Sequence, residues 1–232
     1  MEPEYGETWA YESIIGALPG IDLSPREAIA LQLAVFEVSV LALAWYYGLR
    51  TAAIAGTAAV FVAALGSAEM LRISSAARRP ETPESYRRLL FGSSIEVVLS
   101  VLAFIALVTH LFVFDLRSPE PLVQTLFGSD PPTLAVYLTL LILWDLCYRI
   151  ATGWWVSIVG LWRSIRYRFD RHTASVLRRA DRESALFGLL QVPLLPFLTG
   201  HPVLFAALAA HIAAVLVISG VSLVLLRFKE YE

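Results

Sequence analysis

The chain has 232 residues, of which 57% are hydrophobic and only 16% are charged, and its mean hydropathy is +0.66. Soluble domains carry about a quarter charged residues, whereas apolar runs near 20 residues long match the thickness of a bilayer. The net charge of −2 provides no basic field for nucleic acid, and a single cysteine excludes an intrachain disulfide. We therefore expect one membrane domain over 1–232, with no separate soluble domain.

Residues 1–23 are rich in acids and aromatic residues, and they lack the basic region of a signal peptide. The segment is too short and too polar to cross a bilayer. It is expected to lie at the membrane interface as a short amphipathic helix, or to form a flexible tail.

Six apolar segments follow in 24–232, and they predict an all-α, polytopic bundle of six transmembrane helices. Ser24-Pro25-Arg26-Glu27 is a capping box that begins the first span, and Trp45-Tyr46-Tyr47 form an aromatic interface belt at its end. The six expected spans are Ala28–Leu49, Thr51–Leu71, Glu84–Asp115, Leu134–Trp162, Ala185–Gly200 and Val203–Phe228.

Two spans are expected to deviate from a straight helix. The fourth is longer than an upright helix needs, so it must tilt, protrude or break, with Gly153 as the expected weak point. The fifth carries Pro193 and Pro196, which free backbone carbonyls at mid-membrane. Such a helix either lines a cavity or is a kink filled by packing.

Arginine is distributed unevenly between the loops. The loops after spans two and four hold five and seven arginines, whereas the other three loops hold two between them. By the positive-inside rule, both termini are cytoplasmic in a multi-pass protein of the cell membrane. The basic segment Arg163–Arg182 is also a candidate surface for anionic lipids.

Four acids lie inside the expected spans: Glu37, Glu69, Glu96 and Asp145. Each unpaired charge at mid-membrane costs roughly 2.5–3.5 kcal/mol on insertion scales. Arg149 is the one base at this depth, so acid is in surplus, and a surplus of buried acid suits protons or small cations. Glu37 and Glu96 are the main candidates for a proton or ion pathway, because neither has a base within one turn of its own helix.

The partners of these charges are open at the level of sequence. Arg149 pairs either with Asp145, four residues away, or with Glu37 on another helix. Glu69 is expected to meet Arg72 three residues on. Gln191 is expected to line the pathway.

Histidines allow another interpretation, in which His110 and His211 bind a haem iron axially. The chain contains none of the common hydrolase, P-loop or zinc-protease motifs, so an enzyme is the less favoured class. Ala55, Ala59, Ala63 and Ser67 form a small-residue stripe that permits close helix packing, including in a homo-oligomer.

The blocks EYGETWAYESIIGALPG, RRLLFGSSIEVVLSVLAF and LWDLCYRIATGWW resemble an uncharacterised family of polytopic membrane proteins from halophilic archaea. The resemblance covers most of the chain. It implies an archaeal cell membrane and brings no activity, cofactor or site residue with it.

Three functions are consistent with these features. The first is a protein that moves or binds protons or small cations through a cytoplasm-facing acidic cavity, with no cofactor. The second is a membrane scaffold or accessory subunit, in which the same charges fix the assembly. The third is a haem protein.

Overall fold

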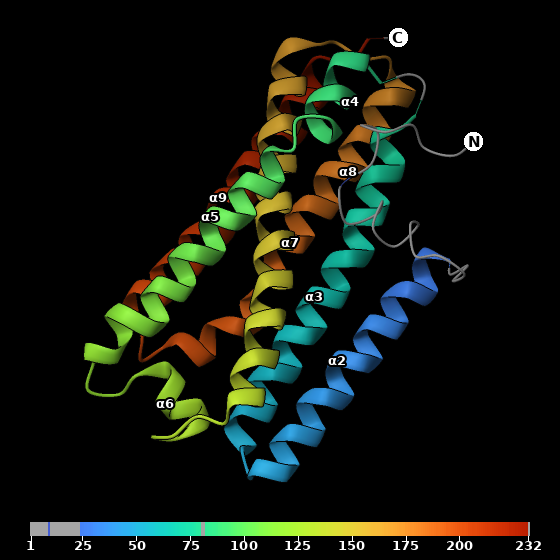
Figure 1. Cartoon of the computed structure of the whole chain (residues 1–232). Helices are drawn as coiled ribbons and strands as arrows, with labels where there is room; N and C mark the ends of the chain where they lie inside the picture. The colour runs from blue at the N-terminus through green and yellow to red at the C-terminus, as the bar shows by residue number, and fades with distance from the viewer. Residues whose placement is uncertain (1–8, 10–23, 80–81, 232) are drawn as a thin grey trace.

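The computed structural model describes residues 9, 24–79 and 82–231, and across these residues the chain is helical, without strands (Figure 1). The helices are α2 (Pro25–Tyr47), α3 (Arg50–Ala77), α4 (Glu84–Phe91), α5 (Ile95–Thr109), α6 (Leu122–Phe127), α7 (Thr133–Arg166), α8 (Arg171–Leu189) and α9 (Pro202–Phe228). Shorter turns are the π-helix η1 (His110–Phe114) and the 3₁₀ helices η2 (Asp115–Arg117) and η3 (Val192–Leu198).

Helices α2 and α3 form an antiparallel pair whose boundaries follow from local sequence. The predicted capping box is confirmed: Glu27 N–H donates to Ser24 Oγ at 3.4 Å, and Ser24 N–H donates to Glu27 Oε2 at 2.8 Å. Gly48 adopts φ +71°, which favours glycine, and it ends α2 directly before α3 begins. Trp45 and Tyr46 are 85% and 73% exposed at this end, as an interface belt requires.

The expected third span is divided. Helix α4 ends at Gly92, and Ser94 adopts φ +53° before α5 begins. The break matters because it places Glu96 in the first turn of α5 rather than in the middle of a continuous helix.

Helix α7 is the central element, with α5 and α9 packed on one side of it and α3 on the other (Figure 1). It is unbroken from Thr133 to Arg166, so the expected weak point at Gly153 is wrong. The glycine instead makes room for a neighbour: a Cβ there would lie 2.8 Å from Cδ1 of Phe187 on α8.

The expected fifth span, Ala185–Gly200, is not one continuous helix. Its first residues belong to α8, which begins in the supposed loop at Arg171, and the two prolines lie in the 3₁₀ helix η3. Proline lacks the N–H that an α-helix needs, so the chain tightens into 3₁₀ geometry. The segment still runs the length of the bundle, because Asp170 bridges Tyr231 at one end and His201 contacts Asp115 at the other.

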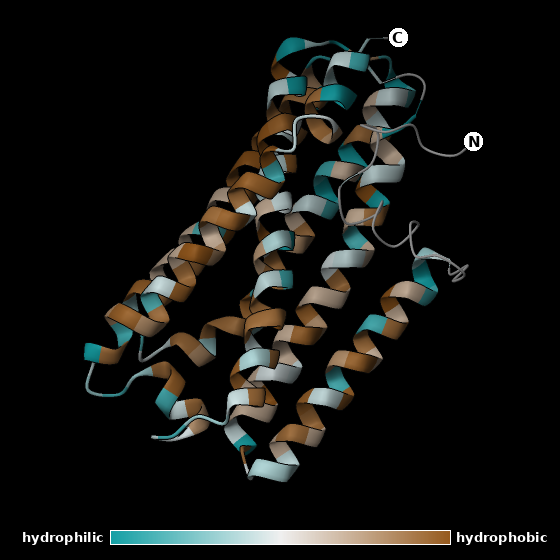
Figure 2. Ribbon diagram, viewed as in Figure 1, coloured by the Kyte–Doolittle hydropathy of each residue, from teal (hydrophilic) through white to brown (hydrophobic). Residues whose placement is uncertain are grey.

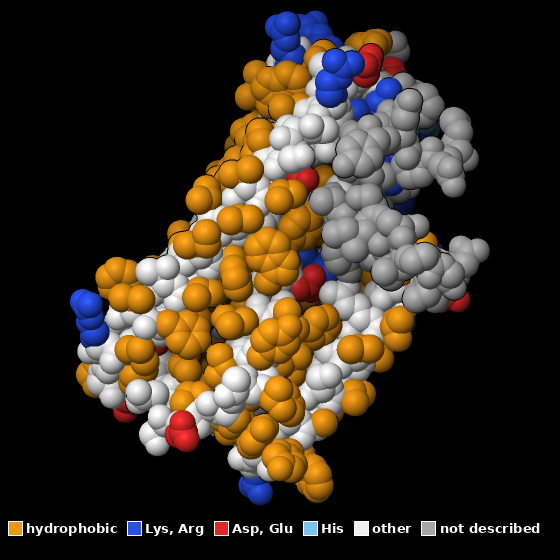
Figure 3. All heavy atoms as spheres, viewed as in Figure 1, with side chains coloured by type: hydrophobic (Ala, Val, Ile, Leu, Met, Phe, Trp, Pro, Cys, Tyr) orange, Lys and Arg blue, Asp and Glu red, His pale blue; other side chains and the backbone are white. Residues whose placement is uncertain are grey.

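Five helical stretches among the described residues are long and apolar enough to cross a membrane. They are Pro25–Tyr47, Arg50–Ala77, Glu84–Arg117, Thr133–Arg166 and Pro202–Phe228. Hydrophilic residues gather at the end of the bundle that holds α4 and the C-terminus (Figure 2). Hydrophobic side chains cover much of the remaining visible face (Figure 3). Length, composition and surface are those of a multi-pass membrane protein.

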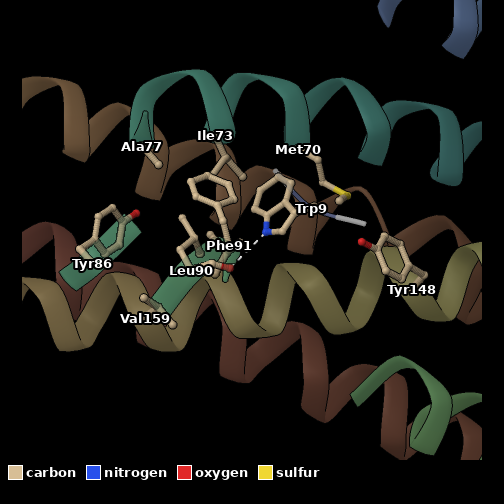
Figure 4. Packing of buried hydrophobic residues seen from close by; sticks show 10 residues of the cluster. Trp9, Met70, Ile73, Ala77, Tyr86, Leu90, Phe91, Tyr148 and Val159 are labelled. Carbon is tan, nitrogen blue, oxygen red and sulfur yellow. Dashed lines mark hydrogen bonds between the residues drawn. The ribbon is translucent and has the colours of Figure 1, made fainter. Parts of the chain in front are cut away.

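The predicted amphipathic helix or tail at 1–23 lies outside the described residues, except for Trp9. That indole is fully buried, packs on Phe91 with ring centroids 5.2 Å apart, and donates from Nε1 to the carbonyl of Leu90 at 3.4 Å. It lies beside Met70 of α3, between that helix and α7 (Figure 4). Trp9 is therefore a core residue rather than an interfacial one.

Candidate functional site

Arg149 and Asp145 form a two-point ion pair on α7. Arg149 Nε lies 3.0 Å from Asp145 Oδ2, and Nη2 lies 2.7 Å from Oδ1. The arginine is fully buried, and Nη2 also donates to Gln32 Oε1 of α2 at 3.4 Å. The choice that the sequence left open between Asp145 and Glu37 is thus decided for Asp145, because the i, i+4 spacing lets the planar guanidinium meet both carboxylate oxygens.

Close helix packing holds this pair. A Cβ on Gly66 of α3 would lie 2.5 Å from Cε2 of Phe187 and 3.3 Å from Cδ of Arg149. Because Gly153 of α7 also contacts Phe187, one ring from α8 fits between two helices that lack side chains there. The cavity that Asp145 lines is small, at about 10 Å³, which is room for about one water molecule.

Glu37 lies apart from this pair, at the interface of α2 and α3. Thr57 donates from Oγ1 to Glu37 Oε1 at 2.7 Å. The second oxygen, Oε2, is buried, and no described residue donates to it. The small-residue stripe lies on α3, the helix that carries Thr57. Ala63 and Ser67 of this stripe are buried inside the chain, so this part of it serves intrachain packing.

Glu96 is the most deeply buried of the predicted acids, at 1% exposure. It lies in the first turn of α5, where the helix dipole favours a carboxylate. Its Oε2 has no hydrogen-bond partner among the described residues. The interruption of the helix at Gly92–Ser94 creates this environment, and the sequence analysis did not predict the interruption.

Glu69 meets Arg72, as predicted, with 2.7 Å between Oε1 and Nη1. The same Nη1 lies 3.4 Å from Oε2 of Glu183 on α8, which the sequence did not indicate. The pKa of Glu183 lies below its usual value, chiefly because it accepts a hydrogen bond from the Glu69 carboxyl, and because Arg72 and Arg179 place positive charge beside it. Two carboxyls and one guanidinium thus join α3 to α8.

Gln191 is fully buried at the end of α8, where it donates from Nε2 to the carbonyl of Phe187 at 3.3 Å. Its Oε1 has no partner within the described part of the chain. Among the described residues, no hydrogen bond joins Gln191 to the predicted acids. The cavity beside Asp145 is lined by neither Glu37 nor Glu96.

Within the described part of the chain, the two histidines proposed for haem each pack on another aromatic ring, His110 on Phe114 and His211 on Trp154. His211 of α9 packs on Trp154 and lines a groove with Leu99 and Ala103 of α5. His110 begins η1, seven residues beyond Ala103 of α5 and about 10 Å farther along the helix axis.

Sequence reasoning missed the most extensive polar network, which centres on Arg163 and Asp181. Arg163 Nη2 lies 2.8 Å from both oxygens of Asp181, and Nη1 lies 3.2 Å from the hydroxyl of Tyr86. Ser222 of α9 donates to Asp181 Oδ2 at 2.7 Å. These buried residues join α4, α7, α8 and α9.

A pattern in the sequence could have located Asp181. The side chains buried along α8 recur at helical spacing, and Asp181 falls within this series although arginines surround it in the sequence. The buried members of the series are Thr173, Ala174, Leu177, Ala180, Asp181, Ser184, Phe187 and Gly188.

Among known proteins, no curated protein and no solved structure matches the chain. The model of one family of unknown function, DUF7530, matches residues 4–222. Because this match extends over nearly all of the 232 residues, the chain belongs to the DUF7530 family of unknown function.

Proposed function

We propose that this membrane protein binds and moves protons by means of buried carboxyl groups. The observation that carries the proposal is that Glu37 and Glu96 each bury an oxygen to which no described residue donates. A carboxylate held at membrane depth without a cation is costly, so each of these oxygens is a candidate binding point for a proton. A group that is neutral at rest and can lose its proton is the basic unit of an intramembrane proton relay.

Protons fit the described residues better than metal cations do. The described part of the chain holds no group of three or more His, Cys, Asp or Glu side chains that could bind a metal ion. Arg149 is paired with Asp145 on α7, and Glu37 accepts a hydrogen bond from Thr57. Glu69 and Glu183 lie nearer the basic end of the bundle, where they would exchange protons with the aqueous phase.

The proposed topology is a single membrane domain with six crossings, both chain ends being cytoplasmic. The length of the path from Asp170 to His201 supports a crossing by α8 and η3. Exposed arginines lie around the Asp170 end of that path, which the positive-inside rule therefore makes the cytoplasmic side. A haloarchaeal cell membrane belongs to the same proposal, through the resemblance noted above.

A scaffold or accessory subunit is the second candidate, and a different observation favours it. The two deeply buried guanidiniums, Arg149 and Arg163, are each held by an aspartate. Charges that satisfy one another inside the chain can serve packing alone.

A flux measurement separates the two candidates. The protein is reconstituted in liposomes that enclose a pH-sensitive dye. A potassium gradient with valinomycin sets a membrane potential that drives protons across the bilayer. We expect flux in the wild type, a loss of most of it in Glu37→Gln and Glu96→Gln, and no change in Glu120→Gln, which removes an exposed loop acid. Wild-type flux equal to that of empty liposomes would reject proton movement and leave the scaffold.

A further inference from the structure

The exposed face of α8 changes character along its length. Its first half presents Arg171, His172, Ser175, Arg179 and Arg182, whereas its last turns present Leu186 and Leu189, which are 42% and 48% exposed. Arg182 and Leu186 are one helical turn apart, about 6 Å along the axis. The surroundings that suit this face therefore change from polar to apolar within one turn, as the surroundings of a helix do at the edge of a bilayer.

The neighbouring helices change from apolar to basic at nearly the same level. Arg72 of α3 contacts Glu183, so these two residues define one level of the bundle. Arg163 and Ser222 contact Asp181, so Arg166 of α7 and Arg227 of α9 lie only about 5 and 8 Å farther toward the basic end. All of these helices thus expose arginine within a layer of about 11 Å at the basic end of the bundle.

Not every arginine in the predicted basic segment Arg163–Arg182 belongs to this surface. Arg163 is 1% exposed and is bound to Asp181, and Arg178 is paired with Glu230. The exposed arginines of the segment are Arg166, Arg168, Arg171, Arg179 and Arg182. Four of them, Arg166, Arg168, Arg179 and Arg182, form what we call the α8 arginine surface.

Little negative charge opposes this surface. The Asp181 carboxylate is buried with Arg163, and the Asp170 carboxylate accepts the N–H of Thr173 at the start of α8. Arg179 lies 3.8 Å from Glu183 yet is 80% exposed. Its guanidinium therefore remains open to an anion from solvent.

We propose that the α8 arginine surface binds the phosphate headgroups of anionic membrane lipids. Guanidinium groups bind phosphate by paired, charge-assisted hydrogen bonds. Leu186 and Leu189 lie one and two turns deeper on the same face, where the chains of a bound lipid would contact them. A headgroup and a chain are thus matched by one helix face, which is why a lipid suits the surface better than a free anion.

The test uses the full chain in detergent, mixed with equal amounts of phosphatidylglycerol and phosphatidylcholine. Native mass spectrometry then gives the ratio of the two lipids that remain bound. We expect phosphatidylglycerol to dominate, and Arg179→Gln with Arg182→Gln to reduce that preference about 25-fold, at about five-fold for each charge. Arg179→Lys with Arg182→Lys, which keeps both charges, should retain most of the preference.

The matched control is Arg50→Gln with Arg117→Gln, which removes two exposed arginines from the opposite end of the bundle. An equal loss of preference in this control, or no loss in the α8 double variant, would overturn the proposal. Competition by inorganic phosphate at the concentration of the lipid would also overturn it, since the surface would then bind free anions. If the α8 double variant does not give a single monodisperse species, Arg166→Gln with Arg168→Gln provides the same test, with a loss in the same direction expected.

Discussion

Arg163 of α7 places a single Nη2 atom 2.8 Å from both carboxylate oxygens of Asp181 on α8. The pair is buried, and Ser222 and Tyr86 satisfy further polar atoms around it. Of the paired charges in the described residues, this one joins the greatest number of helices.

Removing one partner of this pair should destabilise the protein strongly. Asp181→Asn leaves a buried guanidinium without its counter-charge, and we expect a loss of about 3–5 kcal/mol in the free energy of unfolding. Thermal unfolding in detergent, followed by tryptophan fluorescence, measures it. Arg163→Met with Asp181→Leu removes both charges and should be less destabilising than Asp181→Asn. A double variant that is the less stable of the two would contradict this account.

The second prediction concerns the fit of Phe187 against two glycines. Gly153→Ala places a methyl group 2.8 Å from the ring, closer than a real Cβ contact, so the ring or the helix must move. We expect a cost of about 1–3 kcal/mol, as for other overpacked cores. Gly153→Ala combined with Phe187→Leu should recover part of this loss, because the smaller side chain releases the clash. Gly128→Ala is not a suitable control, because Gly128 has a φ of +84°, and any residue with a side chain is strained in that backbone conformation. Gly220→Ala, whose Cβ would meet no atom within 4 Å, is suitable.

The third prediction concerns pH. The pKa of Glu183 is lowered in the folded chain from its ordinary value of 4.5, so the folded state binds fewer protons at this group than the unfolded state does. Its stabilising contribution is therefore complete above about pH 4.5 and is lost as the pH falls through the folded pKa. In unfolding midpoints measured from pH 7 to pH 3, Glu183→Gln should show a shallower decline below pH 4.5 than the wild type. Parallel curves for the two proteins would show that Glu183 does not contribute in this way.

The start of α8 provides a fourth prediction. Asp170 accepts a hydrogen bond from the Thr173 N–H at 3.0 Å, which makes it the N-cap of the helix. Asp170→Ala should lower the unfolding midpoint, whereas Asp170→Asn, which can still accept this bond, should lower it less. The unfolding midpoints of the two variants provide the comparison, and equal losses would indicate that capping is not the reason.

Local features of the fold follow from nearby residues and were predictable. The capping box at Ser24, the αL turn at Gly48 and the Arg72–Glu69 contact each join residues that are close in sequence. The long apolar stretches likewise follow from composition. The Asp145–Arg149 pair belongs to the same class, since an i, i+4 spacing brings both groups to one side of a helix.

Features that depend on contacts between distant residues were not predictable in the same way. Span five was expected to be a membrane helix interrupted by its two prolines. Its composition does not reveal that α8 begins at Arg171 or that the prolines lie in a 3₁₀ helix. Arg163 and Asp181 were assigned to a loop, because neither residue signals its partner 18 positions away.

The sequence by itself thus determined a helical membrane chain with buried acids, because hydrophobic length and local spacing are encoded in neighbouring residues. Only the tertiary structure decided which acids have partners. It placed Asp145 on Arg149, Glu37 on Thr57 and Glu69 beside Glu183, and it left one oxygen of Glu96 without a described donor. The physical reason is that a buried charge is satisfied by whichever donor the packing of other helices brings within reach, and helix packing is a property of the whole chain.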